Sequence, residues 1–421
     1  MIFGGTVGVG ILRMPGTIAG QLSNGGLILA VWILGGVYAL LGAVSVAELG
    51  AAMPQAGGFY VYAKRAFGPG AGFAMGWADW LNNCAVVAYG AVAASEYLGA
   101  LTGLGIEAQR WIALGLLALF CGLHWFGLRL SSGIQKVTSS VTAITLVVLA
   151  VACLLHAGPA MHAAVAMSGT GRGAGVVGML APLVAALRAI VVTYDGWYEA
   201  IYFTEEDTDA AKHLPRAMIG GVLLVMGLYL LMNVAFLHVL SIPVLANSKL
   251  AAADAARVVF PAWSGNFVTV LSLLTLLSLM NAVLLGAPRI LFAIGRDGLF
   301  AGAGRVGAGG TPRAALVVTA GMAAIFVASG RFDEIIAVAA ILVAAMYCVN
   351  YVAVFVLRVR EPGMVRPFRA WGYPVTTGLV LLGSGVFLVA DVKDDPVSAM
   401  WAAVLLGIAA PVYWWRSYKR P

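Results

Sequence analysis

Residues 3–12 read FGGTVGVGIL, an apolar run that four glycines interrupt at the start of the chain. A second apolar run, VVTYDGW at residues 191–197, is interrupted by an aspartate and a glycine near the centre. A helix that breaks inside a bilayer leaves backbone N–H and C=O groups unpaired, which is costly unless they line a cavity and bind something. Two such breaks in matching halves of a chain indicate the binding site for a small solute.

The composition is that of an integral membrane protein. Apolar residues make up 62% of the 421 residues and charged residues only 10%, whereas charged residues form about 25% of soluble domains. Twelve apolar runs are near the length that crosses about 30 Å of hydrocarbon. These predicted spans are 2–21, 25–52, 71–102, 110–128, 137–157, 177–204, 216–240, 264–293, 313–330, 334–357, 373–391 and 396–415. We therefore expect an all-α fold with a single membrane domain.

The placement of the basic residues predicts the orientation. Of the 25 Lys and Arg residues, 17 fall in one set of loops, 6 in the other, and Arg13 and Arg188 inside spans. Because basic loops stay in the cytoplasm, both termini are predicted to be cytoplasmic in a multi-pass protein of the cell membrane. The net charge of +7 thus points to the lipid bilayer as partner, including anionic lipid, rather than to nucleic acid.

Other site classes find no support in the sequence. All four cysteines fall inside spans and the five histidines show no ligand spacing, so we expect neither a disulfide framework nor a metal. GGTVGVG lacks the lysine of a phosphate-binding loop, and no cofactor is expected. No group of residues in the sequence suggests a catalytic site, so we do not expect the protein to be an enzyme.

The span count suggests two halves. Residues 1–157 would hold helices 1–5, residues 177–357 helices 6–10, and residues 373–415 two peripheral helices. An odd number of spans in each half gives the halves opposite orientations, so that helix 6 mirrors helix 1.

Several stretches, in order, resemble the amino acid–polyamine–organocation transporters, especially bacterial relatives of the L-type amino acid exchangers. They are GVGILRMPG (8–16), AELGAAMPQAGGFYVYAKRAFGP (47–69), YDGWYEAIYFTEE (194–206), LPRA (214–217), MNAVLLGAPRILFAIGRDGLF (280–300) and RPFRAWGYPV (366–375). The resemblance implies a five-plus-five inverted repeat with helices 1 and 6 unwound, and transport by alternating access.

The breaks offer partners for both charged groups of an amino acid substrate. Amide groups at the start of the second half of helix 1 suit a carboxylate, and carbonyls that end the first half-helices suit an ammonium. The predicted donors are Gly8, Val9 and Gly10, and the predicted acceptors are Thr6, Val7, Val192 and Thr193. Gly4 and Gly8 also form a GxxxG pair, which alone would indicate close helix packing.

Charged and polar groups inside the spans are further candidates, because they are costly there. Asp195, Tyr194, Gly196 and Trp197 complete the predicted substrate site, with Asp195 as a cap of the broken helix and candidate proton carrier. Arg13, Glu199, Asp79 and Asn281 are predicted to gate or couple transport. The alternatives are a buried ion pair, for example between Arg13 or Arg188 and Asp195 or Glu96, and a packing hydrogen bond for Asn281.

The sequence departs from the resembled family at three places. Val9 stands where relatives often have serine, and Thr142 aligns with a lysine that replaces a sodium ion in relatives. Only about three residues precede the glycines, so we expect part of the first half-helix to be missing from this sequence.

We therefore predict a secondary transporter of amino acids, neutral L-amino acids first, by exchange or proton symport. The alternatives are a transporter of polyamines or cationic amino acids and a non-transporting sensor with the same fold.

Overall fold

The computed structural model describes residues 2–8, 10–156, 176–260, 264–300, 302–307, 309–330 and 332–418, and every element in these ranges is helical. In chain order the elements are α1 (Ile2–Thr6), α2 (Gly10–Gln21), α3 (Gly25–Ala52), α4 (Phe59–Phe67), α5 (Pro69–Thr102), α6 (Ile106–Trp125), α7 (Leu128–Leu155), α9 (Val176–Thr193), the 3₁₀-helix η1 (Trp197–Glu206), α10 (Ala210–Val239), α11 (Ile242–Ala246), α12 (Ala251–Val259), α13 (Ser264–Arg296), α14 (Arg313–Ser329), α15 (Phe332–Arg360), α16 (Val375–Asp394) and α17 (Pro396–Tyr418).

The helices coincide with the predicted apolar runs. Nine of the described helices are long and apolar enough to cross a membrane: α3, α5, α6, α7, α10, α13, α15, α16 and α17. Of the remaining three runs, α14 is a shorter apolar helix, and the other two form the interrupted pairs α1–α2 and α9–η1. The all-α membrane fold is thus confirmed, whereas the inverted repeat stays a prediction. The short helices α11 and α12 were not predicted.

Both predicted breaks are present. α1 stops at Thr6 and α2 starts at Gly10, so the first apolar run is not one helix. α9 stops at Thr193, and the chain resumes at Trp197 in 3₁₀ form after Gly196, whose φ is 99°. This left-handed conformation suits glycine, because a Cβ atom there is strained.

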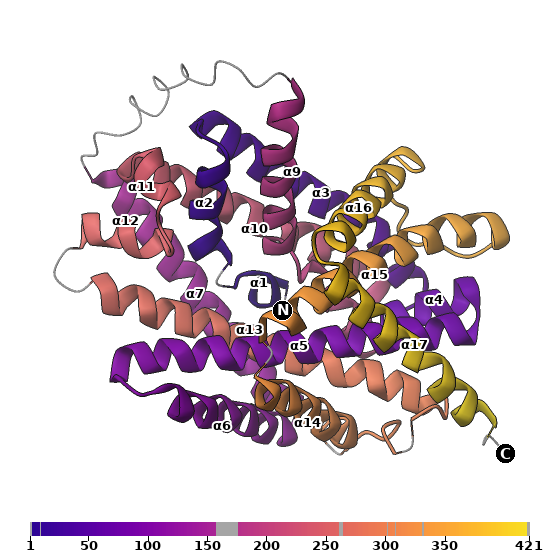
Figure 1. Ribbon diagram of the computed structural model, residues 1–421. Helices are drawn as coiled ribbons and strands as arrows, with labels where there is room; N and C mark the ends of the chain where they lie inside the picture. Colours follow the sequence, from indigo (N-terminus) through magenta and orange to yellow (C-terminus); the bar gives the residue numbers. More distant parts are fainter. Residues whose placement is uncertain are drawn as a thin grey trace.

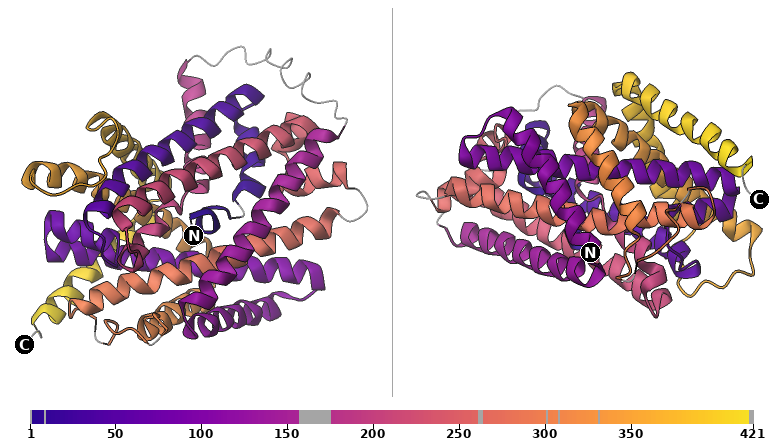
Figure 2. Two further views of the ribbon diagram at one scale, coloured as in Figure 1. Left: turned by 180° about the vertical axis from the view of Figure 1, so that it is seen from behind. Right: turned by 90° about the horizontal axis from the view of Figure 1, so that it is seen from below.

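The interrupted helices lie at the centre of the bundle. Figure 1 shows α1 near the middle, with α2, α9, α10 and α13 around it, and α1 contacts α7, α10, α13 and η1. The most extensive packing joins α5 to α13 and α3 to α10. α6 and α14 lie side by side at one edge, and α17, which contacts α5 and α15, runs along the outside of the bundle in the right-hand view of Figure 2.

One end of the bundle is fastened by ion pairs between segments that are distant in the sequence. Lys64 in the last turn of α4 contacts Asp297 beyond α13 at 2.5 Å, and Arg65 of the same turn contacts Glu361 at 2.7 Å. Further pairs join Arg289 to Glu206 (2.7 Å), Arg296 to Glu205 (2.5 Å) and Arg358 to Glu48 (2.6 Å). All five cations belong to the loops or span ends that the charge bias assigns to the cytoplasm.

Candidate functional site

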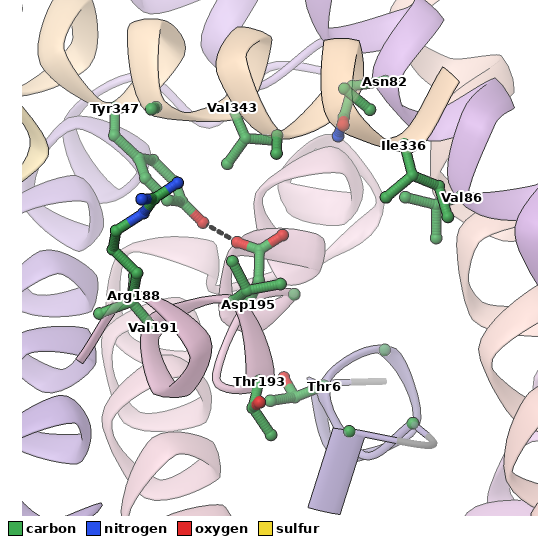
Figure 3. A pocket seen from close by; sticks show the side chains of 18 of the residues that line it. Thr6, Asn82, Val86, Arg188, Val191, Thr193, Asp195, Ile336, Val343 and Tyr347 are labelled. Carbon is green, nitrogen blue, oxygen red and sulfur yellow. Dashed lines mark hydrogen bonds between the residues drawn. The ribbon is translucent and has the colours of Figure 1, made fainter. Parts of the chain in front are cut away.

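A cavity of about 650 Å³ lies where the two interrupted helices meet (Figure 3). Volumes of about 300–1,000 Å³ are typical of sites for small ligands. The lining comes from both breaks and from α5, α15 and α16, and includes Gly5, Thr6, Gly8, Gly10, Asn82, Asn83, Val192, Thr193, Asp195, Gly196, Glu199, Tyr347 and Ser384. From Asp195 the lining continues along α9 toward its start, from Val192 through Arg188 to Ala185, and Val192 is 66% exposed.

The two breaks touch each other directly. A Cβ atom on Gly196 would lie 2.6 Å from the carbonyl oxygen of Gly5, and one on Gly10 would lie 2.8 Å from Cγ2 of Thr193. Such distances leave no room for a side chain at either glycine. The breaks therefore form one continuous wall of backbone, in which a movement of one is transmitted to the other.

The broken ends leave backbone N–H and C=O groups without a partner inside their own helix. The first N–H groups of α2 have no partner within their own helix, and the same holds for the last carbonyls of α1 and α9. The Gly8 N–H is already engaged, because it donates to the Thr6 carbonyl at 3.0 Å. A zwitterion that carries a carboxylate and an ammonium group on one carbon atom can bind to N–H and C=O groups placed in this way.

Tyr229 of α10 joins the two breaks from behind. Its hydroxyl lies 3.0 Å from the Thr6 carbonyl oxygen and 3.2 Å from the Thr193 carbonyl oxygen, at hydrogen-bonding distance from the last residue of each half-helix. The side chain is completely buried and packs edge-on against Trp32. One hydroxyl thus holds both carbonyl-rich ends at a fixed separation.

Asp195 brings a carboxyl group to the cavity. Figure 3 shows it pointing toward α15, where the Tyr347 hydroxyl donates a hydrogen bond to Oδ1. Arg188, two turns earlier on α9, also lines the cavity, but it forms ion pairs with Asp391 and Asp394 of α16. The alternative of an ion pair between Arg188 and Asp195 or Glu96 is therefore wrong.

Aromatic rings close the cavity on the side of the ion-paired end. Tyr198 packs against Phe59 at 5.1 Å between ring centroids and against Tyr347 at 6.0 Å. Trp197 stacks on Tyr347 at 5.5 Å. Since these rings come from α4, η1 and α15, the closure depends on three separate elements staying together.

Comparison with known proteins identifies the family. The family model of the amino acid permeases matches residues 1–410. The chain belongs to the amino acid permease family. This permease is 26% identical to the serine/threonine exchanger SteT of Bacillus subtilis (strain 168) over 98% of its own length and 94% of the relative. It is 24% identical to the b(0,+)-type amino acid transporter 1 of Rattus norvegicus (98% and 85% covered) and 27% to the Asc-type amino acid transporter 1 of Mus musculus (99% and 80%).

These similarities confirm the resemblance and the predicted activity class. The permease is a membrane transporter of amino acids, as the family description and the names of these relatives state. Family and relatives are transporters rather than enzymes.

The structure brings most of the predicted site residues to the cavity of the permease. Those that line it are Thr6, Gly8, Gly10, Val192, Thr193, Asp195, Gly196 and Glu199. Val7, Tyr194 and Trp197 are buried beside the breaks without lining the cavity, and the Tyr194 hydroxyl donates to the Trp32 carbonyl. Val9 lies outside the described residues.

The residues predicted to gate or couple transport divide in the same way. Asp79 is buried behind the wall, where its Oδ1 accepts hydrogen bonds from Tyr202 (2.7 Å) and Asn83 (3.0 Å). Asn281 forms the packing hydrogen bonds that were its alternative, to Ser131 at 3.0 Å and to Gln135 at 2.7 Å. Arg13 lies exposed on α2 outside the cavity lining.

The sequence reasoning overlooked three contributors to the site. Asn82 and Asn83 are two adjacent amide side chains within an apolar helix, and both line the cavity. Polar residues inside a membrane span usually mark a functional site, so the sequence did contain a signal for them. Tyr347 carries no such signal, because a tyrosine in an apolar run is as often a packing residue.

Replacing Tyr229 with phenylalanine tests the coupling of the two breaks. Loss of the hydroxyl leaves the Thr6 and Thr193 carbonyls without this donor, and we expect the free energy of unfolding to fall by about 1 kcal/mol. Substrate affinity is expected to fall about tenfold, or about 1.4 kcal/mol, because the two ends are no longer held together. Thermal melting and ligand titration of purified protein measure both effects.

The matched control is Tyr194→Phe, whose hydroxyl bonds only Trp32 of the unbroken helix α3, at 3.2 Å. Equal losses of affinity in the two variants would show that Tyr229 has no special role at the breaks.

Proposed function

We propose that this permease exchanges neutral L-amino acids across the cytoplasmic membrane by alternating access. The observation that carries the proposal is the meeting of two interrupted helices at one closed-ended cavity. The N–H groups that begin α2, at Gly10 and beyond, bind the substrate carboxylate. The carbonyls of Thr6, Val192 and Thr193 bind the ammonium, and the substrate side chain extends toward Asn82 and Val86 of α5.

The two ends of the bundle differ as we expect of a transporter whose cavity is open to one side of the membrane and closed to the other. The ion pairs and the aromatic rings around Tyr198 close one end, while the cavity lining extends along α9 toward its start, as far as Ala185. With both termini in the cytoplasm, as the positive-inside rule predicts, the closed end faces the cytoplasm and the cavity faces outward. Opening the cytoplasmic side then requires the pairs Arg296–Glu205 and Lys64–Asp297 to separate.

The packing also supports two related halves, residues 1–157 and 177–357, with residues 373–415 outside them. The most extensive contacts, α5 with α13 and α3 with α10, join elements at corresponding places of the two halves. Such pairing is expected when a pseudo-twofold axis lies in the membrane plane between the halves.

Counterflow into liposomes tests the proposal. Purified permease is reconstituted in vesicles loaded with one unlabelled amino acid, and uptake of external labelled L-serine or L-threonine is measured. We expect internal neutral amino acids to accelerate uptake severalfold over empty vesicles. Uptake that no internal amino acid accelerates would contradict exchange, and saturable binding without any uptake would favour a sensor.

A cationic amino acid or a polyamine is the second candidate, because the carboxyl groups of Asp195 and Glu199 line the cavity while the Arg188 charge is neutralised by Asp391 and Asp394. Counterflow driven by internal arginine or putrescine, and not by serine, would favour it. The variant Asp195→Asn separates the cases, since only a cationic side chain needs that charge.

A further inference from the structure

One buried carboxyl group of the cavity, that of Glu199, carries an oxygen atom without a hydrogen bond among the described residues. Glu199 stands in the first turn of η1 and is 2% exposed. Within the part of the chain that the structure describes, its Oε2 accepts no hydrogen bond. It nevertheless borders the cavity, so a proton or a solute can reach it through the cavity.

Two glycines from other helices make room for this side chain. A Cβ atom on Gly286 of α13 would lie 2.7 Å from Oε2 of Glu199, and one on Gly5 of α1 would lie 2.9 Å from its Cγ. Glu199 is therefore held between the backbones of α1 and α13. These are the elements that must part from η1 for the closed end of the bundle to open.

Two other carboxyl groups, Asp79 and Asp195, lie near Glu199. The further titratable side chains on the packed elements are Tyr198, Tyr202, Tyr229 and Arg289, and the N-terminal ammonium group adds a positive charge. Arg289 is the one cationic side chain in this set, and it bonds Glu206 through Nε and the Leu285 carbonyl through a terminal nitrogen. An ionised carboxylate buried without a partner beside other carboxylates is strongly disfavoured, and addition of a proton removes that charge.

We propose that Glu199 is the proton-binding group of this permease, and that the closed arrangement of η1, α1 and α13 forms when Glu199 is neutral. The inference rests on the proposed transport function and makes the exchange depend on a proton. A proton from solution forms the O–H bond of the Glu199 carboxyl group before the closed end forms. When η1 separates from α1 and α13, water reaches the group and the proton can leave. Glu199 must bind a proton again before this end closes, so a complete exchange cycle moves no net proton and involves no oxidation or reduction.

The experiment combines labelled L-serine counterflow with a pH-sensitive dye inside the vesicles. For the wild-type permease we expect counterflow to rise as the outer pH falls from about 8 to about 5.5, by at most about tenfold per pH unit for one proton. Because Glu199 binds a proton again before each closure, the dye should show no net change in luminal pH during exchange. In Glu199→Gln, which keeps the size of the side chain, we expect a flat pH profile of counterflow.

Glu96→Gln is the matched control, because Glu96 is an exposed carboxyl group on α5, and its pH profile should follow the wild type. Wild-type counterflow with a flat pH profile would overturn the inference while leaving the transport function intact. No counterflow at all by the wild type would overturn both. The same steep profile in Glu199→Gln, or stimulation by sodium in place of protons, would exclude Glu199 as the proton site.

Discussion

Replacement of Gly8 with leucine is expected to abolish uptake of labelled amino acid while the protein stays folded. Gly8 borders the cavity, and a Cβ atom there would meet only Cδ2 of Leu279, at 3.8 Å. Its φ is not among the positive values, so a side chain adds no backbone strain. A leucine side chain therefore projects into the space that the substrate occupies, and we expect uptake to fall at least about a hundredfold, or about 2.7 kcal/mol.

Gly8→Ala is the control for this prediction. Its single methyl group makes an ordinary van der Waals contact, so uptake should stay within about threefold of the wild type. Melting temperatures of all three proteins show whether folding is preserved. Uptake by Gly8→Leu near the wild-type rate would mean that the substrate binds elsewhere.

Replacement of Gly196 with alanine is expected to have the largest effect on stability. A left-handed conformation costs an alanine about 1–2 kcal/mol, and Gly196 has a φ of 99°. The added Cβ would also lie 2.6 Å from the carbonyl oxygen of Gly5, and overpacking of this kind costs about 1–3 kcal/mol. The two effects together lower the free energy of unfolding by about 2–5 kcal/mol, and transport fails because the breaks are pushed apart.

Gly227→Ala provides the comparison within α10. An added Cβ there meets no atom within 4 Å, and the residue is helical, so its melting temperature should equal or slightly exceed that of the wild type. If Gly196→Ala melted at the same temperature as Gly227→Ala, the close contact between the two breaks would be in doubt.

The course of the chain was predictable because hydrocarbon imposes a strong length and composition rule. Each of the twelve apolar runs coincides with a helix or an interrupted pair. The start of α7 was less accurate: the helix begins at Leu128 rather than at residue 137, because Arg129 and Lys136 lower the local hydropathy of a segment that is helical nonetheless. The aromatic and basic segment at 53–70, which lies between two predicted spans, contains the short helix α4.

The site was predictable where the backbone itself provides it. The glycines of residues 3–12 and the Asp-Gly pair at 195–196 mark the breaks, since few other residues tolerate an interrupted helix in lipid. The contacts that support the breaks could not be derived in the same way. The Tyr229 hydroxyl meets Thr6 across 223 residues of sequence, and Tyr347 meets Asp195 across 152. Such pairings depend on how distant helices pack, which local patterns do not encode.

The position of α16 indicates how the selectivity for substrate side chains can change without a change in the backbone site. This helix lies outside both predicted halves, yet it holds Arg188 through Asp391 and Asp394 and adds Phe387 to the mouth of the cavity. Side chains at the entrance can therefore change without disturbing the backbone groups that recognise what all amino acids share. Substitutions on α16 would then alter which side chains are admitted, while the breaks continue to recognise the common zwitterionic head.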